Sequence, residues 1–462
     1  MSMMTLQQAA QAMNGLLIGA DTTFDSVSTD SRKIGTGELF VALRGEKFDG
    51  HDFVAMVRDA GCVAAVIDQV ALETVGGLGL PLIVVADTRL ALGALAAAWR
   101  LRFAIPVIAV TGSNGKTTTK EMIAGILRAA WGDTVLATQG NFNNDIGLPL
   151  TLLRLNAGHR AAVIEMGMNH PGEIGYLARL TQPTVAIVTN AQRAHLAGMG
   201  TLEMIATEKG SVFQGLPATG VAVINGDDLW AELWRSQAEG RRVMEYSFAH
   251  DAEVTGDCRT HGLENRLSIR AQGQALELAL AVPGAHNARN ALGAATAALA
   301  AGVSLAAVSE GLQSFGGVKG RLQRRLGANG ATVLDDSYNA NPDSVRAGID
   351  VLAATVGRKI LVLGDMGEIG DMTGQFHDEI GGYAKSQGLD RLLAVGESSA
   401  LSAYNFGLGG EHFKTPEELV ARLLAEMTPE TTVLVKGSRF MRMERIVDAV
   451  VADGETTSGG DH

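Results

Sequence analysis

The sequence predicts an α/β protein of three domains, in which largely parallel sheets are covered by helices. Short apolar runs that end in a polar residue recur along the chain and alternate with helical patterns. Such runs are typical of strands buried on both faces of a parallel sheet. The chain of 462 residues is longer than one typical domain, and its 46% hydrophobic content can fill several cores. The 57 glycines fit an architecture with many strand-to-helix turns.

The first domain is expected to be a small α/β unit over residues 1–104. Strand-like runs occupy 38–43, 64–68 and 82–87, with helical patterns between them. An alanine-rich stretch at 90–102 is expected to close the domain as a helix. Cys62 lies among apolar residues and, like Cys258, belongs to no metal-binding motif, so we expect a reduced core residue.

The second domain, 105–316, opens with the most informative segment of the chain. Residues 107–120 read V-I-A-V-T-G-S-N-G-K-T-T-T-K, which predicts a buried strand, a glycine-rich turn and a helix from about Lys116. Such a turn binds nucleotide phosphates, because Gly112 and Gly115 let backbone N–H groups approach anionic oxygens at a helix N-terminus. Lys116 can then reach the terminal phosphates, and Thr117 can offer a hydroxyl to Mg²⁺. A plain tight turn with an exposed lysine is the alternative.

This loop departs from the generic phosphate-loop motif at one position. The motif has a glycine five residues before Gly115, where this chain has Val110. The compact G-x-x-G-K-T form therefore indicates a particular nucleotide-using family rather than a generic ATPase.

Further buried strands of the second domain are predicted at 161–166, 184–190 and 221–225. Because chemistry in open α/β sheets gathers beyond the carboxyl ends of the strands, Glu165, Asn190 and Asn225 are expected near the phosphate loop. Residues 253–282 alternate in polarity and predict a small antiparallel insertion. The stretch 290–308, rich in alanine and glycine, predicts buried helices rather than a membrane span.

The third domain, 317–453, is predicted to be a second open α/β sheet of Rossmann-like type. Its strands are expected at 332–336, 359–365, 391–397 and 432–438, and their polar ends would form one rim: Asp336, Asp365, Glu397 and Lys436. Two such domains facing each other would make a cleft for two substrates. Residues 454–462 are expected to form a flexible tail.

Several other residues allow both a structural and a functional interpretation. Glu165 ends a strand where acids hold Mg²⁺ in phosphate-loop proteins, so we favour a metal role. We interpret His195 as an ordinary loop histidine, because Mg²⁺ prefers oxygen ligands. Manganese accepts histidine more readily. Lys209, beside Glu208, reads as a solvated charge. The amide-rich segments around Asn141 and Asn144, 283–292 and 335–342 are either turns and caps or contacts to a polar ligand.

Composition and charge limit the classes of partner. The net charge of −12, without a basic run, argues against nucleic-acid binding. The N-terminus lacks the pattern of a signal peptide, so we expect a cytoplasmic protein without integral membrane contact, in the form of a monomer.

Taken together, the motifs resemble the Mur ligases of bacterial cell-wall synthesis. They are T-G-S-N-G-K-T-T-T-K, E-M-G-M-N-H-P-G-E-I, H-L-A-G-M-G, E-K-G-S-V-F, H-N-A-R-N-A-L, D-D-S-Y-N-A-N-P-D-S and K-G-S-R. The resemblance covers nearly the whole chain in order. The central-loop motif is shared with folylpolyglutamate synthetases, whereas the other motifs together are more specific.

The resemblance implies an N-terminal domain that binds the UDP-sugar, a central ATPase domain and a C-terminal Rossmann-like domain. It implies catalytic roles for Lys116, His195 and Lys209. His195 becomes a metal ligand with Thr117 and Glu165, and Lys209 matches a carbamylated lysine. The implied ATP contacts are Gly112, Ser113, Asn114, Gly115, Lys116, Thr117, Thr118, Asn287, Arg321 and Asp336. The implied substrate contacts are Ser31, Arg32, Asn141, Asn144, Tyr338, Asn339 and Asn341.

The implied activity is ATP-driven amide formation through an acyl phosphate, with Mg²⁺ or Mn²⁺ as the metal. The implied substrates are UDP-N-acetylmuramoyl-tripeptide and D-alanyl-D-alanine. Alternatives of the same class are a Mur ligase that adds one amino acid and a folylpolyglutamate-type ligase. Alternatives of other classes are a phosphate-loop switch or binding protein and a phosphate-loop kinase.

Overall fold

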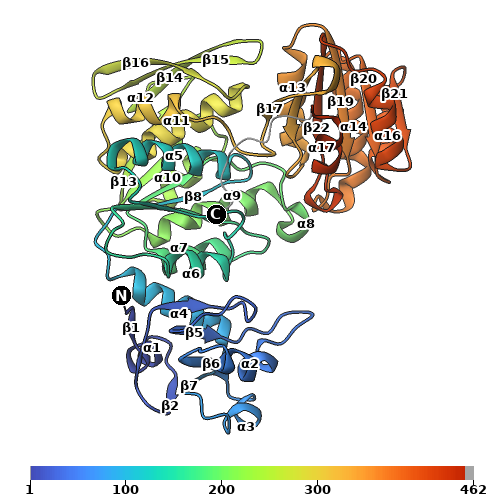
Figure 1. The fold of residues 1–462 in the computed structure, drawn as a ribbon. Helices are drawn as coiled ribbons and strands as arrows, with labels where there is room; N and C mark the ends of the chain where they lie inside the picture. The colour runs from blue at the N-terminus through green and yellow to red at the C-terminus, as the bar shows by residue number, and fades with distance from the viewer. Residues whose placement is uncertain (1, 453–462) are drawn as a thin grey trace.

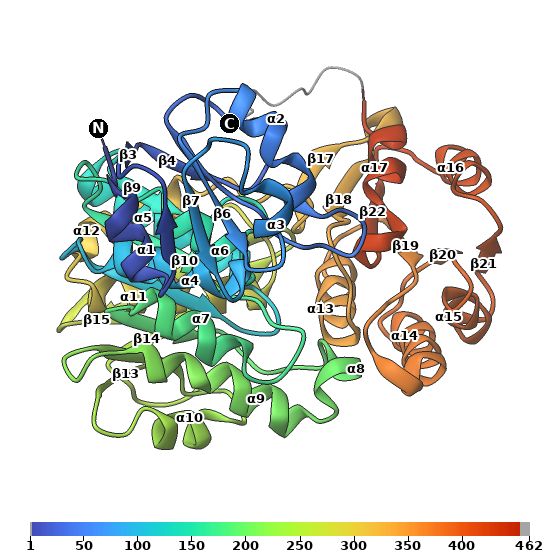
Figure 2. The same cartoon turned by 90° about the horizontal axis from the view of Figure 1, so that it is seen from below.

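The computed structural model describes residues 2–452 and contains three α/β bodies (Figure 1). The N-terminal body is blue, the central body is teal to yellow, and the C-terminal body is orange to red. Figure 2, turned by 90°, shows the C-terminal body beside the central one, with α8 (Leu196–Met199) reaching toward it. The predicted α/β class is confirmed, and the predicted tail, 454–462, lies outside the described residues.

The N-terminal body is built on a five-stranded sheet in the order β2-β7-β6-β5-β4. Its strands are β2 (Leu16–Ile18), β4 (Ser26–Ser28), β5 (Glu38–Val41), β6 (Ala64–Asp68) and β7 (Leu82–Val85). A separate pair joins β1 (Met4–Thr5) and β3 (Thr23–Phe24). The helices are α1 (Leu6–Ala12), η1 (Gly50–Phe53), α2 (Val54–Asp59), α3 (Leu72–Val75) and α4 (Thr88–Arg100). Asp87 caps α4 by accepting hydrogen bonds from the N–H groups of Arg89 and Leu90.

The central body holds a nine-stranded sheet in the order β16-β15-β14-β13-β12-β11-β8-β10-β9. The strands are β8 (Val107–Thr111), β9 (Val135–Ala137), β10 (Ala161–Glu165), β11 (Val185–Val188), β12 (Val221–Asn225), β13 (Arg242–Ser247), β14 (Val254–His261), β15 (Glu264–Ala271) and β16 (Gln274–Leu280). All neighbours from β9 to β14 are parallel, and β14–β16 are antiparallel. The segment predicted as an insertion is antiparallel, but it continues the central sheet, because the unpredicted β13 links it to β12.

Helices cover both faces of the central sheet, as the continuous apolar strands require. They are α5 (Lys116–Trp131), α6 (Gly147–Leu152), α7 (Glu173–Thr181), α8, α9 (Leu202–Gly210), η2 (Ser211–Gly215), α10 (Ala231–Gln237), α11 (Ala285–Ala300) and α12 (Leu305–Gln313). Ile108 and Val110 of β8 pack in one core with α5, α11 and α12, while Val107 and Ala109 pack in another with α4 and α7. The predicted buried helices at 290–308 are therefore confirmed, and α4 joins the first two bodies.

The C-terminal body holds a six-stranded sheet in the order β17-β18-β22-β19-β20-β21. The strands are β17 (Gln323–Leu326), β18 (Thr332–Asp336), β19 (Arg358–Gly364), β20 (Arg391–Val395), β21 (Gly410–Phe413) and β22 (Thr431–Lys436). Only β17 runs antiparallel. The helices are η3 (Ala328–Gly330), α13 (Pro342–Ala353), η4 (Gly370–Met372), α14 (Thr373–Ser386), α15 (Ser399–Phe406), α16 (Pro416–Leu424), η5 (Arg439–Met441) and α17 (Glu444–Val450). No helix within residues 2–452 combines the length and apolar character needed to cross a bilayer.

Candidate active site

A cleft of about 1480 Å³ lies between the central and C-terminal bodies, with the start of α4 at its edge. The carboxyl ends of β8, β10, β11 and β12 supply its floor, and the segment after β18 supplies the facing wall. Glu165, Asn190 and Asn225 all line this cleft, as their places at strand ends predicted. Because β8 lies between β10 and β11, the loop that follows β8 opens at the centre of the floor.

The phosphate loop requires glycine at two positions. Gly112 and Gly115 have φ angles of +151° and +80°, which residues with a side chain rarely adopt. A Cβ atom at Gly112 would lie 1.8 Å from Thr189 Oγ1, and one at Gly115 would lie 2.4 Å from Asn290 Oδ1. Gly115 is also the residue from which α5 begins, so the N–H groups of the first turn open toward the cleft. The loop therefore has the shape and polarity of an anion site.

Side chains beyond β11 brace the phosphate loop. The N–H of Asn114 donates to Asn190 Oδ1 at 2.9 Å, and Thr189 Oγ1 donates to the Asn114 carbonyl at 2.7 Å. Ser113 Oγ donates to the Gln192 carbonyl at 3.0 Å. These bonds fix the loop before any ligand binds, which reduces the ordering cost of binding.

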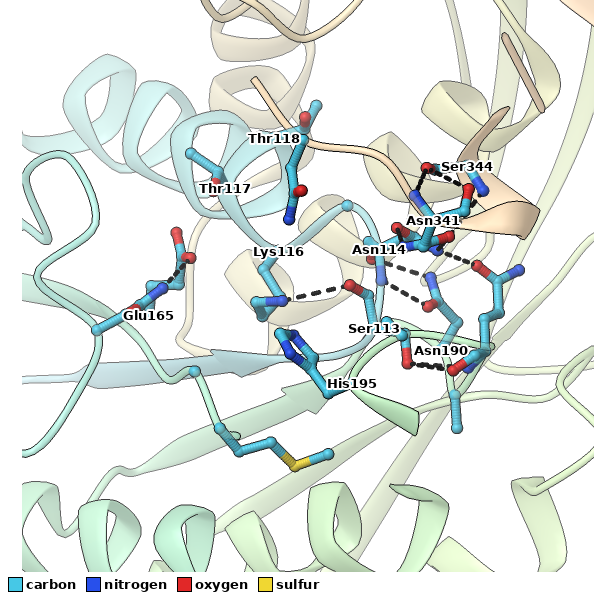
Figure 3. A pocket seen from close by; sticks show the side chains of 18 of the residues that line it. Ser113, Asn114, Lys116, Thr117, Thr118, Glu165, Asn190, His195, Asn341 and Ser344 are labelled. Atoms are coloured by element: carbon cyan, nitrogen blue, oxygen red, sulfur yellow. Dashed lines mark hydrogen bonds between the residues drawn. The ribbon is translucent and has the colours of Figure 1, made fainter. Parts of the chain in front are cut away.

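Lys116 extends along this loop (Figure 3). Its Nζ donates to the carbonyls of Gly112 at 2.8 Å and Ser113 at 3.3 Å. Desolvation in the cleft lowers the pKa of the ammonium, and the Glu165 carboxylate partly offsets this effect. Lys116 thus places a positive charge directly over the glycine-rich turn.

The three predicted metal ligands surround the same space, with Glu165 and His195 on either side of Lys116 (Figure 3). Glu165 Oε1 accepts a hydrogen bond from Asn143 Nδ2 at 2.8 Å. Its Oε2 is buried and has no hydrogen-bond partner among residues 2–452. An unpaired buried carboxylate oxygen is costly unless a cation or water satisfies it, so the site fits a divalent metal. Within the described chain no three His, Cys, Asp or Glu side chains form a ready cage, and Mg²⁺ beside phosphates needs only one or two protein carboxylates.

Lys209 differs from the solvated charge that its sequence neighbours indicated. It is buried at the end of α9 and does not line the cleft. Desolvation lowers its pKa well below the usual lysine value, and the Lys116 charge adds to the effect. Its neighbour Glu208 points elsewhere, accepting from the N–H groups of Gly172 and Ile174 at the start of α7. The solvated interpretation was therefore wrong.

The predicted nucleotide contacts outside the loop lie on both sides of the cleft. Asn287, near the start of α11, donates to the Pro283 carbonyl at 2.8 Å. Part of its hydrogen-bonding capacity is therefore used within the turn that precedes the helix. The Arg321 guanidinium lies 4.1 Å from the centre of the Tyr338 ring. Asp336 Oδ2 accepts from Lys436 Nζ at 2.6 Å, and both side chains are buried. All three candidates line the cleft.

The predicted substrate contacts divide into two groups. Asn141, Asn144, Tyr338, Asn339 and Asn341 line the cleft, whereas Ser31 and Arg32 do not. The latter lie in the loop between β4 and β5, where Arg32 pairs with Asp30 at 2.8 Å and is exposed. Asn144 Oδ1 accepts from the Gly147 N–H at 2.9 Å, so the turn interpretation also holds at this position.

An interdomain contact at Asn341 was not predicted. Its Oδ1 caps α13 by accepting from the Ser344 N–H at 2.9 Å, while its Nδ2 donates to Asn114 Oδ1 in the phosphate loop at 2.8 Å. The C-terminal body therefore contacts the loop directly.

Arg193, which sequence reasoning missed, makes an ion pair between the two bodies through several contacts to one carboxylate. Its Nη2 lies 2.6 Å from Asp343 Oδ1, its backbone N–H donates to Asp343 Oδ2 at 2.8 Å, and its guanidinium lies 5.2 Å from the Phe376 ring centre. Asp343 and Phe376 belong to α13 and α14. No local pattern distinguishes Arg193 from a surface arginine, because Asp343 is 150 residues away in the sequence.

Removing either partner of this pair is expected to open the cleft. We expect Arg193→Ala and Asp343→Ala each to lower the closed population, measured from the distance between fluorescent labels on the two bodies. The double variant should be no more open than the single variants, with a coupling energy of about 0.5–3 kcal/mol. Arg259→Ala, on an exposed β14 position, serves as the control. Strictly additive effects would contradict a direct coupling.

Comparisons with known proteins agree with this geometry. Three family models match the chain: Mur ligase family, catalytic domain, at 23–100; Mur ligase middle domain, at 110–298; and Mur ligase, glutamate ligase domain, at 320–439. The UDP-N-acetylmuramoyl-tripeptide–D-alanyl-D-alanine ligase of Escherichia coli (strain K12) is 42% identical over 97% of this chain and 99% of that protein. The enzyme of that name from Bacillus subtilis (strain 168) is 33% identical over 97% and 98%.

Solved structures show the same architecture. MurF from Acinetobacter baumannii has a TM-score of 0.88 at 35% identity, covering 96% of this chain and 97% of that one. The MurF ligase of Thermotoga maritima, crystallised in complex with ADP, has a TM-score of 0.79 at 26% identity, covering 92% and 96%. The resemblance read from the motifs and the three-domain fold are confirmed, and the chain belongs to the Mur ligase family.

Proposed function

We propose that this protein is an ATP-dependent ligase that joins D-alanyl-D-alanine to the terminal carboxylate of UDP-N-acetylmuramoyl-tripeptide in the synthesis of peptidoglycan precursors. The observation that carries the proposal is the cleft itself, where a preformed phosphate loop faces the amide- and arginine-rich wall of a second α/β body. The names of the full-length relatives support the same choice of substrates.

The proposed roles follow the positions of the side chains. Gly112, Ser113, Asn114, Gly115, Thr117 and Thr118 would hold the ATP phosphates with Lys116, while Asn287, Arg321 and Asp336 would contact the rest of the nucleotide. Thr117, Glu165 and His195 would hold the metal, which supplies positive charge to the phosphate oxygens when bound. Asn141, Asn144, Tyr338, Asn339 and Asn341 would contact the peptide substrates, and Ser31 and Arg32 the UDP-sugar.

The chemistry needs a poor electrophile to be activated. The tripeptide carboxylate would attack the γ-phosphorus of ATP, ADP would leave, and the neutral amine of the dipeptide would then displace phosphate from the acyl carbon. A nearby carboxylate or water would accept the amine proton. Negative charge gathers on the phosphoryl oxygens during transfer, so Lys116 and the loop N–H groups stabilise the transition state more than the ground state.

Closure of the cleft serves this chemistry because water must not reach the acyl phosphate. The Arg193–Asp343 and Asn114–Asn341 contacts hold the two walls together at the phosphate loop. A cleft closed in this way also brings the second wall within reach of both substrates.

Lys209 is proposed to be carbamylated. Burial and the Lys116 charge favour its neutral amine, the form that adds CO₂ and releases a proton. The product is an anion, so its interaction with Lys116 would become attractive. A carbamate could therefore support the metal site where an ammonium would oppose it.

We expect Lys209→Ala to lose about 10–100-fold in kcat, the usual cost of removing an outer partner of a metal site. Short carboxylic acids should restore part of this activity by supplying the missing anion. Lys116→Ala is the matched control, because a phosphate-binding cation cannot be replaced by an acid. Full activity of Lys209→Ala, or equal rescue of both variants, would contradict the carbamate.

The substrate assignment is tested by measuring phosphate release and product mass with ATP, Mg²⁺ and UDP-N-acetylmuramoyl-tripeptide. The expected product contains D-alanyl-D-alanine, and single amino acids should give none. A switch protein would hydrolyse ATP without either acceptor, and a kinase would leave a stable phosphorylated product. Absence of a product that contains D-alanyl-D-alanine would refute the substrate assignment.

The remaining parts of the proposal concern organisation. We propose domain limits at 1–104, 105–316 and 317–453, a cytoplasmic location and a monomer. Limited proteolysis and sedimentation of the full chain test the limits and the monomer, since cleavage within 105–316 or a dimer would contradict them.

A further inference from the structure

A glutamate of the C-terminal body reaches the site across the cleft. Glu368, in the loop after β19, places its Oε2 at 2.8 Å from His195 Nδ1, which belongs to the segment after β11. Both residues line the cleft. The Glu368 carboxylate also interacts electrostatically with the Lys116 ammonium. A carboxylate from one body thus meets the basic centre of the other.

The backbone around this contact is held in place on both sides. His195 and Glu368 have φ angles of +59° and +61°, a left-handed conformation that is uncommon for residues with side chains. The Ala197 N–H donates to the Glu368 carbonyl at 3.2 Å, and Leu196 packs against the core of the C-terminal body. An ion pair, a backbone hydrogen bond and an apolar contact therefore dock the two segments, so the pairing does not depend on the two side chains alone.

The contact favours one tautomer when the His195 ring is neutral. An ionised carboxylate only accepts hydrogen bonds, so its approach to within 2.8 Å of Nδ1 favours a proton on Nδ1 and leaves Nε2 with its lone pair. A histidine that ligates a metal commonly donates its other N–H to a carboxylate in this way, which fixes both ring orientation and tautomer.

We propose that Glu368 is a positioning residue that fixes His195 in the Nδ1–H tautomer when the cleft is closed and so presents Nε2 to the metal site. The kinetic part of this inference rests on the proposed function, whereas the tautomer does not. Since the two residues belong to different bodies, His195 is prepared for its role only when the C-terminal body has docked. Closure and assembly of the site become one event.

The tautomer is tested by ¹⁵N NMR of the histidine side chains in the full-length protein with a non-hydrolysable ATP analogue, at a pH where imidazole is neutral. The chain has ten histidines, and His195→Gln assigns the relevant signal. We expect the Nδ1–H pattern in the wild type and loss of it in Glu368→Ala. Glu368→Gln should give a mixture, because its amide can accept from or donate to Nδ1. Asp371→Asn, an exposed acid in the same loop region, should match the wild type.

Kinetics supply the second readout. We expect Glu368→Ala to lower kcat and raise the Mg²⁺ concentration for half-activation by about 10–100-fold, with little change in the KM for ATP. Identical His195 signals in the wild type and Glu368→Ala would overturn the proposal, as would a changed tautomer with unchanged kcat. If the wild type forms no dipeptide product, the proposed substrate fails, and the NMR comparison still decides the role of Glu368.

Discussion

Replacing Lys116 by alanine is expected to lower kcat by about 10²–10³-fold, the cost of removing one well-placed donor from a site where charge develops. The ammonium lies over the phosphate loop and, among residues 2–452, donates to the carbonyls of Gly112 and Ser113. The loop is braced independently through Asn190 and Thr189, so its shape should survive the substitution. Steady-state phosphate release with both acceptors present gives kcat.

The melting temperature provides the control for this prediction. Lys116→Ala removes a partly desolvated cation without breaking a buried ion pair, so we expect little change in thermal stability. Lys414→Ala, at an exposed position of the C-terminal body, should leave both stability and kcat unchanged. A Lys116→Ala enzyme with full activity would refute the phosphate-loop assignment.

The strands that the sequence predicts best are those whose residues are buried on both faces. β8, β10, β11 and β12 are buried along their whole length, so each is a continuous apolar run. β17 and β21 are edge strands with mixed exposure, and they carry no such run; β2, also at an edge, has only three apolar residues, two of them exposed. Their strand conformation comes from pairing with a neighbour, which is a property of the assembled sheet.

The same difference between local and assembled features separates the site residues that were predictable from those that were not. The phosphate loop was predictable because Gly112, Gly115 and Lys116 act within one strand–turn–helix unit. The partnerships Asn114–Asn341 and His195–Glu368 join segments from different bodies, so only the docking of the domains creates them. Lys209 was misread because an i,i+1 acidic neighbour says nothing about which face of α9 is buried.

Breaking the buried Asp336–Lys436 pair is expected to have the largest effect on stability. Lys436→Met leaves the Asp336 carboxylate buried without its cation, which typically costs 3–5 kcal/mol. The loss should appear in hydrogen exchange of β18 and β22, the paired strands that end at these residues. Lys414→Met is the matched control at an exposed position.

The double variant Asp336→Asn, Lys436→Met separates two contributions of the pair. Removing both charges should recover much of the stability, because the cost lies mainly in the unpaired charge. Lys436 Nζ also donates to the Asn339 carbonyl at 2.9 Å, and Asp336 Oδ1 accepts from the Leu322 N–H at 3.2 Å. If the double variant is stable but has a raised KM for ATP, the pair also shapes the wall of the cleft. Wild-type exchange rates in Lys436→Met alone would contradict a stabilising role.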